Sequence, residues 1–352
     1  MIRILYASPS ITDTSSFYRG WGALCHLMAE HKNISLMHSA ELNWANVMPA
    51  DLVIFTRSCT AGCVKGIEFC KKQGKFVWLD YDDSILHIPK GNPCYEMFQK
   101  GRDHMHRAAE LADLITVSTE ELKKDFSNVS DKVQLIPNAH NDTLLGEIKA
   151  PKERQKIILW RGSPTHDRDL LQVADKIVNA ANSKQADGWT FVFMGYDPVY
   201  ISSRIIPDRV KCVAALDIID YFNAVKAINP AILIVPLEDT PFNRCKSNIS
   251  WIEATYAGAL TIATDLPEFR RPGVVLTDSQ FFDRDLMQTM EKYDTPGFID
   301  AHWIPSKVFI ENNLYLSGVN KQREAIIWKS IEGQMDRLSR RLTEVGGTSI
   351  PG

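Results

Sequence analysis

The residue types that most clearly point to chemistry lie between positions 236 and 265, in the stretch PLEDTPFNRCKSNISWIEATYAGALTIATD. Its pattern predicts a strand end, a loop, a helix, a glycine turn and a second strand. Lys246, Ser247 and Asn248 fall at the predicted helix N-terminus, where free backbone N–H groups and the helix dipole favour an anion such as phosphate. Glu253 lies seven residues after Lys246, two helical turns further along the same face. An ammonium group and a carboxylate can therefore address one extended ligand, such as a nucleotide diphosphate with its ribose.

The same stretch has a second interpretation that needs no ligand. Ile249, Ile252 and Tyr256 form an apolar stripe at helical spacing, which predicts a helix packed on a core. In that case the polar residues before Ile249 belong to a solvated helix start. The pattern alone fits both interpretations equally well.

A second group of chemically capable residues lies in WLDYDDSILHIP, where Asp80, Asp82 and Asp83 stand at and just after an apolar strand. Three carboxylates this close repel one another, so we expect the pKa of at least one to rise. Asp82 or Asp83 could orient or deprotonate an acceptor hydroxyl. Helix capping and turn formation explain the same residues equally well, and an Asp-x-Asp-Asp run is a weak pattern for a divalent ion.

Several other chemistries are disfavoured by residue spacing. Cys59, Cys63 and Cys70 match no zinc or iron–sulfur ligand pattern, and the seven cysteines are predicted to be reduced, mostly buried thiols. The first strand is followed by SPSITDTSSF rather than a Gly-x-Gly-x-x-Gly loop, which argues against a nicotinamide oxidoreductase. No metal site is predicted.

Residues 242–258 resemble glycosyltransferase family 4, the retaining enzymes with the GT-B fold. The resemblance is strongest to a branch whose nucleotide loop reads Phe-Asn-x-x-Lys-Ser before a helix that bears Glu; Phe242, Asn243, Lys246 and Ser247 match this loop. Glu253 matches the second of the family's two glutamates, which implies that it holds the ribose hydroxyls. The first glutamate would fall on Cys245, so its role does not carry over to this chain.

Three further segments resemble the family in order and position. They are WRGSPTH, residues 160–166, which resembles the Gly-Ser loop at the sugar diphosphate; Pro137-Asn138; and Tyr18-Arg19. The resemblance implies a hexosyl- or pentosyltransferase without an essential metal or other cofactor, in which Arg161 and Lys246 neutralise the leaving diphosphate. The acceptor would attack on the face from which the diphosphate leaves. The implied donor contacts are Arg19, Gly162, Ser163, His166, Asn243, Ser247, Asn248 and Glu253.

The elements that must position these residues form two alternating series. β-rich runs at 2–7, 51–57, 75–81, 114–119 and 133–139 alternate with helical patterns at 16–30, 61–73, 96–112 and 120–125. A second series has runs at 157–162, 189–195, 210–215, 231–237 and 260–265, with helices at 167–182, 218–227 and 247–257. We therefore expect an α/β protein with two Rossmann-like, doubly wound parallel-sheet domains that face a cleft, as in GT-B.

The boundaries follow from composition. A polar linker is predicted at about 141–155, an acceptor-side domain at 1–145, a nucleotide-sugar-binding domain at 146–320, and a C-terminal helix with a tail at 321–352. The final GGTSIPG is expected to fray. In open parallel sheets ligands bind beyond the carboxyl ends of the strands, so the site is expected there.

Composition leaves the acceptor open. The 352 residues carry a net charge of -3, and the N-terminus lacks the long apolar core of a signal peptide or a membrane helix, so a cytoplasmic protein is expected. Family relatives act on polysaccharide, O-antigen or glycolipid, which suggests a glycan or lipid-linked sugar as acceptor. Compact relatives in phage genomes modify hydroxymethylated bases in DNA, and KKQGK (71–75) and FRRPG (269–273) are small basic segments that could contact it. A GT-B epimerase or a non-catalytic nucleotide-sugar-binding protein are further alternatives.

Overall fold

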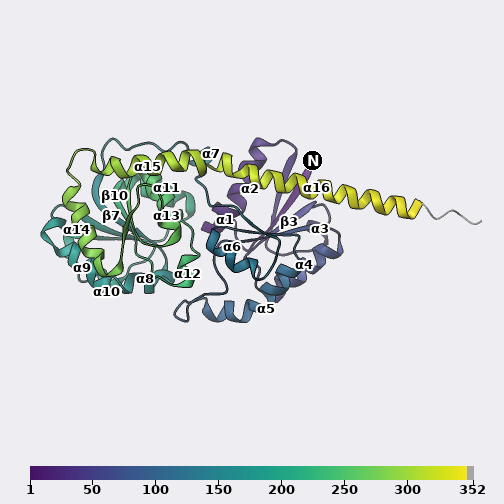
Figure 1. The fold of residues 1–352 in the computed structure, drawn as a ribbon, viewed down its shortest axis with the longest axis horizontal. Helices are drawn as coiled ribbons and strands as arrows, with labels where there is room; N and C mark the ends of the chain where they lie inside the picture. The colour runs from purple at the N-terminus through teal and green to yellow at the C-terminus, as the bar shows by residue number, and fades with distance from the viewer. Residues whose placement is uncertain (347–352) are drawn as a thin grey trace, which may run out of the picture.

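The computed structural model describes the backbone of residues 1–346 and the side chains of residues 1–336. It contains two parallel β-sheets, each flanked by helices, and a long C-terminal helix (Figure 1). The tail expected to fray lies outside the described residues, except for Gly346, which ends the last helix.

The first sheet has six parallel strands in the order β2-β1-β3-β4-β5-β6. The strands are β1 (Ile2–Ala7), β2 (Ile34–Ser39), β3 (Leu52–Thr56), β4 (Phe76–Tyr81), β5 (Leu114–Val117) and β6 (Val133–Leu135). The helices of this half are α1 (Thr14–Arg19), α2 (Trp21–Glu30), α3 (Trp44–Val47), α4 (Ala61–Lys72), α5 (Tyr95–Leu111), α6 (Glu120–Ser127) and α7 (Asp142–Leu145). Apolar strand residues such as Leu5, Val53 and Leu79 are fully buried, because helices cover both faces of a parallel sheet.

The second sheet also has six parallel strands, in the order β12-β11-β10-β7-β8-β9. The strands are β7 (Gln155–Arg161), β8 (Thr190–Met194), β9 (Val210–Val213), β10 (Pro230–Val235), β11 (Leu260–Thr264) and β12 (Val275–Thr277). The helices are α8 (Asp167–Leu171), α9 (Ala174–Asn182), α10 (Val199–Ser202), α11 (Ile218–Ile228), α12 (Pro241–Arg244), α13 (Ile249–Ala257), α14 (Phe282–Lys292), α15 (Phe298–Asn313) and α16 (Leu316–Gly346). The prediction of two doubly wound domains is confirmed.

Two predicted helices are interrupted. The helix expected at 16–30 breaks at Gly20, where a Cβ atom would lie 2.1 Å from the Tyr6 hydroxyl, so only glycine lets the chain pack this closely on β1. The helix expected at 167–182 is divided into α8 and α9. Strands β2 and β12 were not predicted, since β2 mixes polar and apolar residues and β12 has only three residues.

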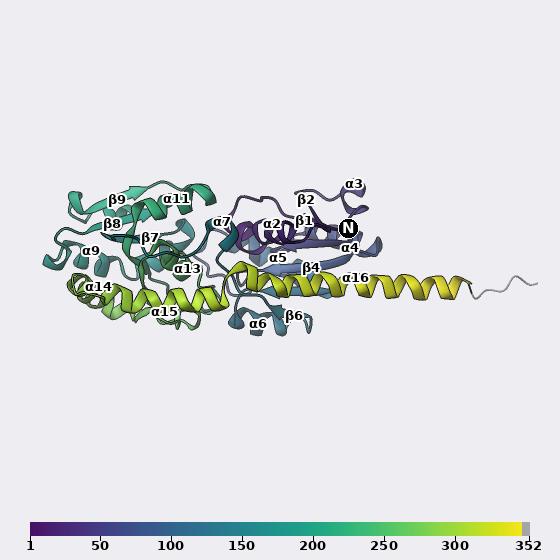
Figure 2. The ribbon, with the colours of Figure 1, turned by 90° about the horizontal axis from the view of Figure 1, so that it is seen from above.

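The last helix joins the two domains. Figures 1 and 2 show α16 leaving the second domain and running along the first. On α16, Asn320 donates a 2.9 Å hydrogen bond to the carbonyl of Ala23 in α2, and Gln334 donates one of 2.9 Å to the carbonyl of Asp51. The helix therefore continues through the boundary expected at residue 320. None of the helices in residues 1–346 combines the length and the apolar character that crossing a membrane requires.

The domains also exchange core contacts. Phe17 and Tyr18 of α1 pack in the hydrophobic core of the second domain, and Cys245 of the second domain packs in the core of the first. Thr119 donates a 2.9 Å hydrogen bond to the Cys245 carbonyl. These contacts fix the two sheets so that the loops after their strands face a common space.

Candidate active site

A cavity of about 1350 Å³ lies between the two domains, lined by the loops that follow β1, β3, β4, β7 and β8 and by the start of α13. Ligand pockets usually measure about 300–1,000 Å³, so this cavity has room for more than one small ligand. It lies beyond the carboxyl ends of the strands, where the sequence predicted a site. The predicted site residues that line it are Asp83, Arg161, Gly162, Ser163, His166, Lys246 and Glu253.

Glu253 is the centre of a buried polar cluster at the base of this cavity. Its side chain is 2% exposed, and its Oε2 atom lies 2.6 Å from Nη2 of Arg161, which ends β7. Tyr18 and Tyr221 donate hydrogen bonds of 2.9 and 2.7 Å to Oε1 and Oε2. The cluster joins α1 of the first domain to β7, α11 and α13 of the second.

Burial and the neighbouring charges determine which groups of this cluster are protonated. Burial, followed by the negative charge of Glu253, raises the pKa of Tyr18 and Tyr221 well above the usual value, so both hydroxyls remain donors. Burial is the largest influence and lowers the pKa of Arg161, but Glu253, Tyr221 and Tyr18 together outweigh burial and raise that pKa. Arg161 therefore carries a permanent positive charge at the cavity.

Lys246 supplies a second positive charge on the same wall. Its Nζ atom lies 4.7 Å from the centre of the Phe242 ring and 3.6 Å from Oδ1 of Asp83, which belongs to the first domain. Helix α13 begins at Ile249 with Asn248 as its N-cap, so Lys246 precedes the helix as expected. The ammonium group thus stands where the two domains meet.

The three aspartates after β4 occupy three different environments. Asp80 is buried and forms a bidentate ion pair with Arg19, with distances of 2.9 and 2.8 Å. Asp82 forms a bidentate ion pair with Arg57, with distances of 2.5 and 2.7 Å. Asp83 lines the cavity, 3.6 Å from both the Arg57 guanidinium and the Lys246 ammonium.

The expected rise in carboxyl pKa is not found at Asp82. Burial raises the pKa of Asp82, but the Arg57 charge and its hydrogen bonds outweigh burial and hold that pKa at about 2. Each aspartate is paired with a basic side chain, which offsets the repulsion that the sequence alone implied. Among residues 1–336, no group of three or more His, Cys, Asp or Glu side chains is arranged to hold a metal ion.

Arg19 does not reach the cavity, although the family resemblance implied a donor contact. Its side chain is buried inside the first domain, where it also donates hydrogen bonds to the Ile136 carbonyl and, at 3.3 Å, to Asn138. These bonds tie α1 to β4 and to the segment after β6. The structure therefore gives Arg19 a supporting position beneath the site.

Three other predicted donor residues also lie behind the cavity wall. Asn243 is buried and donates a 2.6 Å hydrogen bond to Asp169, whose other carboxylate oxygen lies 2.8 Å from Nδ1 of His166. Ser247 accepts a 2.8 Å hydrogen bond from Asn138, and Asn248 donates one of 3.1 Å to Glu268.

His166 therefore has a fixed orientation at the cavity. Burial, and then the nearby Lys246 charge, lower the pKa of His166, so the ring is neutral at pH 7. A neutral ring facing a carboxylate keeps its proton on Nδ1, which leaves Nε2 as an acceptor.

Three residues that the sequence analysis did not single out belong to the site. Tyr221 and Asp169 support Glu253 and His166. Arg57 lines the cavity at the end of β3 and adopts a left-handed backbone with φ of 48°, which is uncommon for a residue other than glycine. A charged residue at the carboxyl end of an apolar strand was the available signal for Arg57. No comparable signal marks Asp169 or Tyr221.

Comparisons with known proteins give no match at the level of sequence. No family model matches the chain, and no curated protein matches it.

Solved structures do resemble it. HepE from Anabaena, in complex with UDP and glucose, has a TM-score of 0.63 and 13% identity over 94% of this chain and 100% of HepE. The pneumococcal O-GlcNAc transferase GtfA, in complex with UDP and GlcNAc, has a TM-score of 0.58 and 12% identity over 80% of this chain. The chain spans 57% of GtfA's length. A proposed UDP-N-acetylglucosamine 2-epimerase from Listeria monocytogenes has a TM-score of 0.55 and 13% identity over 92% of this chain and 97% of its own.

At such low identities the likeness concerns the fold. The arrangement shared with these structures is two parallel six-stranded sheets with flanking helices. The chain therefore has the GT-B fold.

Proposed function

We propose that this protein is a retaining glycosyltransferase, which moves a sugar from a nucleoside diphosphate sugar to an acceptor hydroxyl. The observation that carries the proposal is the convergence of Arg161, Lys246 and Glu253 on one interdomain cavity. HepE and GtfA, which share the fold, hold UDP together with a sugar.

The donor is proposed to bind on the second-domain wall. Arg161 and Lys246 would neutralise the charge that grows on the diphosphate as the glycosidic bond breaks, without an essential metal or other cofactor. The backbone amides at the start of α13 add to this positive field. Glu253, held by its tyrosine partners, would accept the ribose hydroxyls.

The acceptor hydroxyl is proposed to bind beside Asp83. Asp82 is a poor base because Arg57 holds its pKa at about 2, and both its oxygens are engaged by that guanidinium. Asp83 faces the cavity instead, next to the Lys246 ammonium that would contact the diphosphate. A hydroxyl oriented by Asp83 would approach from the side on which the diphosphate leaves, as retention requires.

A glycan or lipid-linked sugar, handled in the cytoplasm, is the acceptor that we propose. The basic segments considered for DNA have partners within the chain: Lys71 lies 2.6 Å from Asp113, and Lys75 donates to two backbone carbonyls. Arg270 and Arg271 pair with Asp265 and Glu268 at 2.6 and 2.7 Å. These pairs offset the positive charge that contacts with a phosphate backbone require.

Incubation with a panel of nucleotide sugars tests the proposal directly. We expect slow release of a nucleoside diphosphate from one of them without acceptor, and a mass increase of one sugar in the matching acceptor. An epimerised nucleotide sugar with no transfer would indicate an epimerase instead. Failure to bind any nucleotide sugar or nucleoside diphosphate would overturn the proposal. Transfer to hydroxymethylated DNA, with binding that weakens as salt rises, would replace the proposed acceptor.

A further inference from the structure

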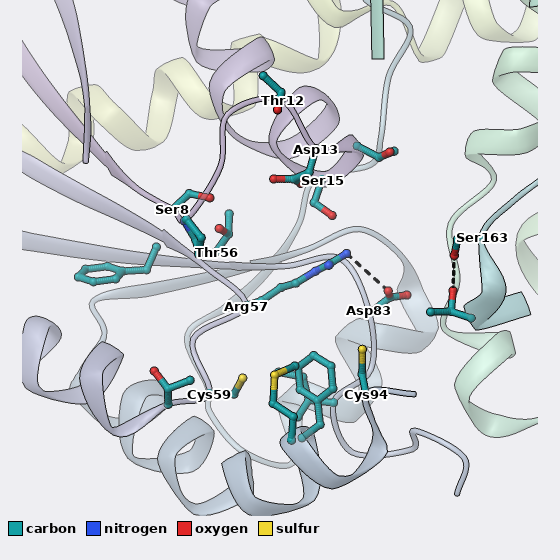
Figure 3. Close-up of a pocket in the computed structure, with 18 of the residues that line it drawn as sticks. Ser8, Thr12, Asp13, Ser15, Thr56, Arg57, Cys59, Asp83, Cys94 and Ser163 are labelled. Carbon is teal, nitrogen blue, oxygen red and sulfur yellow. Dashed lines mark hydrogen bonds and ion pairs between the residues drawn. The ribbon is translucent and has the colours of Figure 1, made fainter. Parts of the chain in front are cut away.

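The first-domain wall of the cavity has two chemically different parts, which Arg57 separates (Figure 3). On one side of Arg57, the loop after β1 presents hydroxyl and carboxylate groups, including those of Ser8, Thr12 and Asp13. On the other side, Figure 3 shows the thiols of Cys59 and Cys94. The wall is therefore not a uniform polar surface for a sugar chain.

The second part forms an apolar subsite. It consists of Cys59, Ile85, Ile88, Cys94, Met97 and Phe98, contributed by the segments before α4 and α5 and by the first turn of α5. None of these six residues is acidic or basic. Met97 is 51% exposed and lines the cavity together with the other five side chains, so this part of the wall offers an apolar surface to a ligand.

Behind Cys59 the subsite is backed by α5. A Cβ atom at Gly101 would lie 2.4 Å from the Cys59 carbonyl oxygen, so α5 packs directly on the segment after β3. This packing leaves no space between the Cys59 carbonyl and α5. The thioether of Met97 and the thiols of Cys59 and Cys94 give this part of the wall sulfur atoms, which pack favourably with aromatic rings.

The donor does not account for this subsite. The diphosphate of the donor would bind Arg161 and Lys246 on the second-domain wall. Asp83 lies between Lys246 and Arg57, 3.6 Å from each. We propose that the apolar subsite binds an aromatic ring, or a ring of similar size and polarity, attached next to the accepting hydroxyl. This inference rests on the proposed glycosyltransferase function and narrows its acceptor to a sugar hydroxyl with a compact apolar ring attached nearby.

Protection of Cys94 from alkylation tests whether a ring occupies the apolar subsite, and it requires no turnover. The intact protein with UDP would be alkylated in the presence of 4-nitrophenyl α-glucoside, methyl α-glucoside or n-octyl α-glucoside, and each cysteine followed by peptide mass spectrometry. We expect the nitrophenyl compound to slow alkylation of Cys94 by roughly fivefold or more, because the ring would cover the thiol. Cys212, exposed on β9 outside the cavity lining, is the matched control and should be unaffected. Equal effects of the methyl and nitrophenyl compounds, or protection by the octyl compound alone, would overturn the proposal.

A substitution at the subsite provides the second test. Met97→Glu places a charge against the ring and should weaken nitrophenyl glucoside binding by roughly tenfold. Met335→Glu is the matched control, since Met335 is 64% exposed on α16 and does not line the cavity. Release of nucleoside diphosphate without acceptor should be unchanged in Met335→Glu, which lies outside the cavity. Unchanged ring binding in Met97→Glu would overturn the subsite alone, whereas loss of nucleotide-sugar turnover in the unmodified protein would overturn the proposed function.

Discussion

The two walls of the cavity hold their charged groups in different ways. On the second-domain wall, Glu253 and Arg161 are paired in a buried site, and two tyrosine hydroxyls also donate hydrogen bonds to the carboxylate. On the first-domain wall, Arg57 is 41% exposed and divides its contacts between Asp82 and Asp83. A buried ion pair whose carboxylate also accepts two hydrogen bonds keeps one geometry, whereas an exposed arginine can exchange partners when a ligand arrives.

This difference corresponds to the two tasks proposed for the walls. A diphosphate needs fixed cations, because stabilisation of a leaving group depends on dipoles and charges that are in place before the reaction. An acceptor that enters after the donor has to displace existing contacts of Asp83. The comparison can be tested by removing one charge at a time from each wall.

The largest effect on stability is expected for Glu253→Gln. This change leaves the Arg161 charge without its carboxylate in a buried site, and we expect a loss of about 3 kcal/mol in the free energy of unfolding. Denaturant unfolding measures the loss. Asp82→Asn is the matched change on the other wall and should lower the free energy of unfolding by about 1 kcal/mol, because water screens the exposed Arg57. Equal losses would show that the walls do not differ in this way.

Lys246→Ala is expected to have the largest effect on turnover. Removing a cation that stabilises the leaving diphosphate should lower kcat by roughly 10²–10³-fold. Lys226→Ala is the control, because Lys226 also lies over an aromatic ring, 4.2 Å from the centre of Tyr256, but does not line the cavity. Both variants should unfold at similar denaturant concentrations. If the unmodified protein shows no turnover and Lys246→Ala changes only the affinity for the nucleotide, the protein is a binding protein instead.

The second-domain wall was more predictable from sequence than the first. Lys246 and Glu253 belong to one short segment, so helical spacing alone places them on one face, and α13 begins where expected. Arg57 and Asp82 are 25 residues apart, and Asp169 and Asn243 are 74 apart. Pairs formed by distant segments leave no local pattern, which is why Arg57 and Asp169 were not anticipated.

Arg19 shows the opposite case, a residue that the sequence pattern singled out but whose side chain does not reach the cavity. A Tyr-Arg pair that resembles a family motif implied a donor contact for Arg19, yet its partner Asp80 lies 61 residues away and holds it inside the first domain. Tyr18, its neighbour, reaches Glu253 across the domain boundary. The strand and helix pattern could be read from local periodicity, but the direction of each side chain depended on the packing of the whole molecule.

Asp83→Asn and Asp82→Asn together test which of these two aspartates orients the acceptor. If Asp83 orients the acceptor, its loss should lower transfer to acceptor by roughly 10²-fold and leave slow donor hydrolysis less affected. Asp82→Asn, whose carboxylate is engaged by Arg57, should retain most of the transfer activity. Transfer and hydrolysis rates measured on the same preparations provide the comparison. A larger loss of transfer in Asp82→Asn would reverse the assignment.

The smallest effect is expected from titration of His166, on the donor wall. Burial and Lys246 lower its pKa in the folded protein, so below the ordinary histidine pKa of about 6.5 the unfolded chain binds more protons than the folded one. His166 should therefore contribute a loss of stability as the pH falls below about 6.5, and none above it. His166→Gln should reduce the loss between pH 7 and pH 5 by on the order of 1 kcal/mol, measured by denaturant unfolding at each pH. His140→Gln is the control for a buried histidine away from the cavity, because burial also lowers the pKa of His140. Bound UDP that places its phosphates beside Lys246 should raise the pKa of His166. The pH dependence of the free energy of unfolding of the unmodified protein should then resemble that of His166→Gln. The part of this pH dependence that is due to His140 should stay the same.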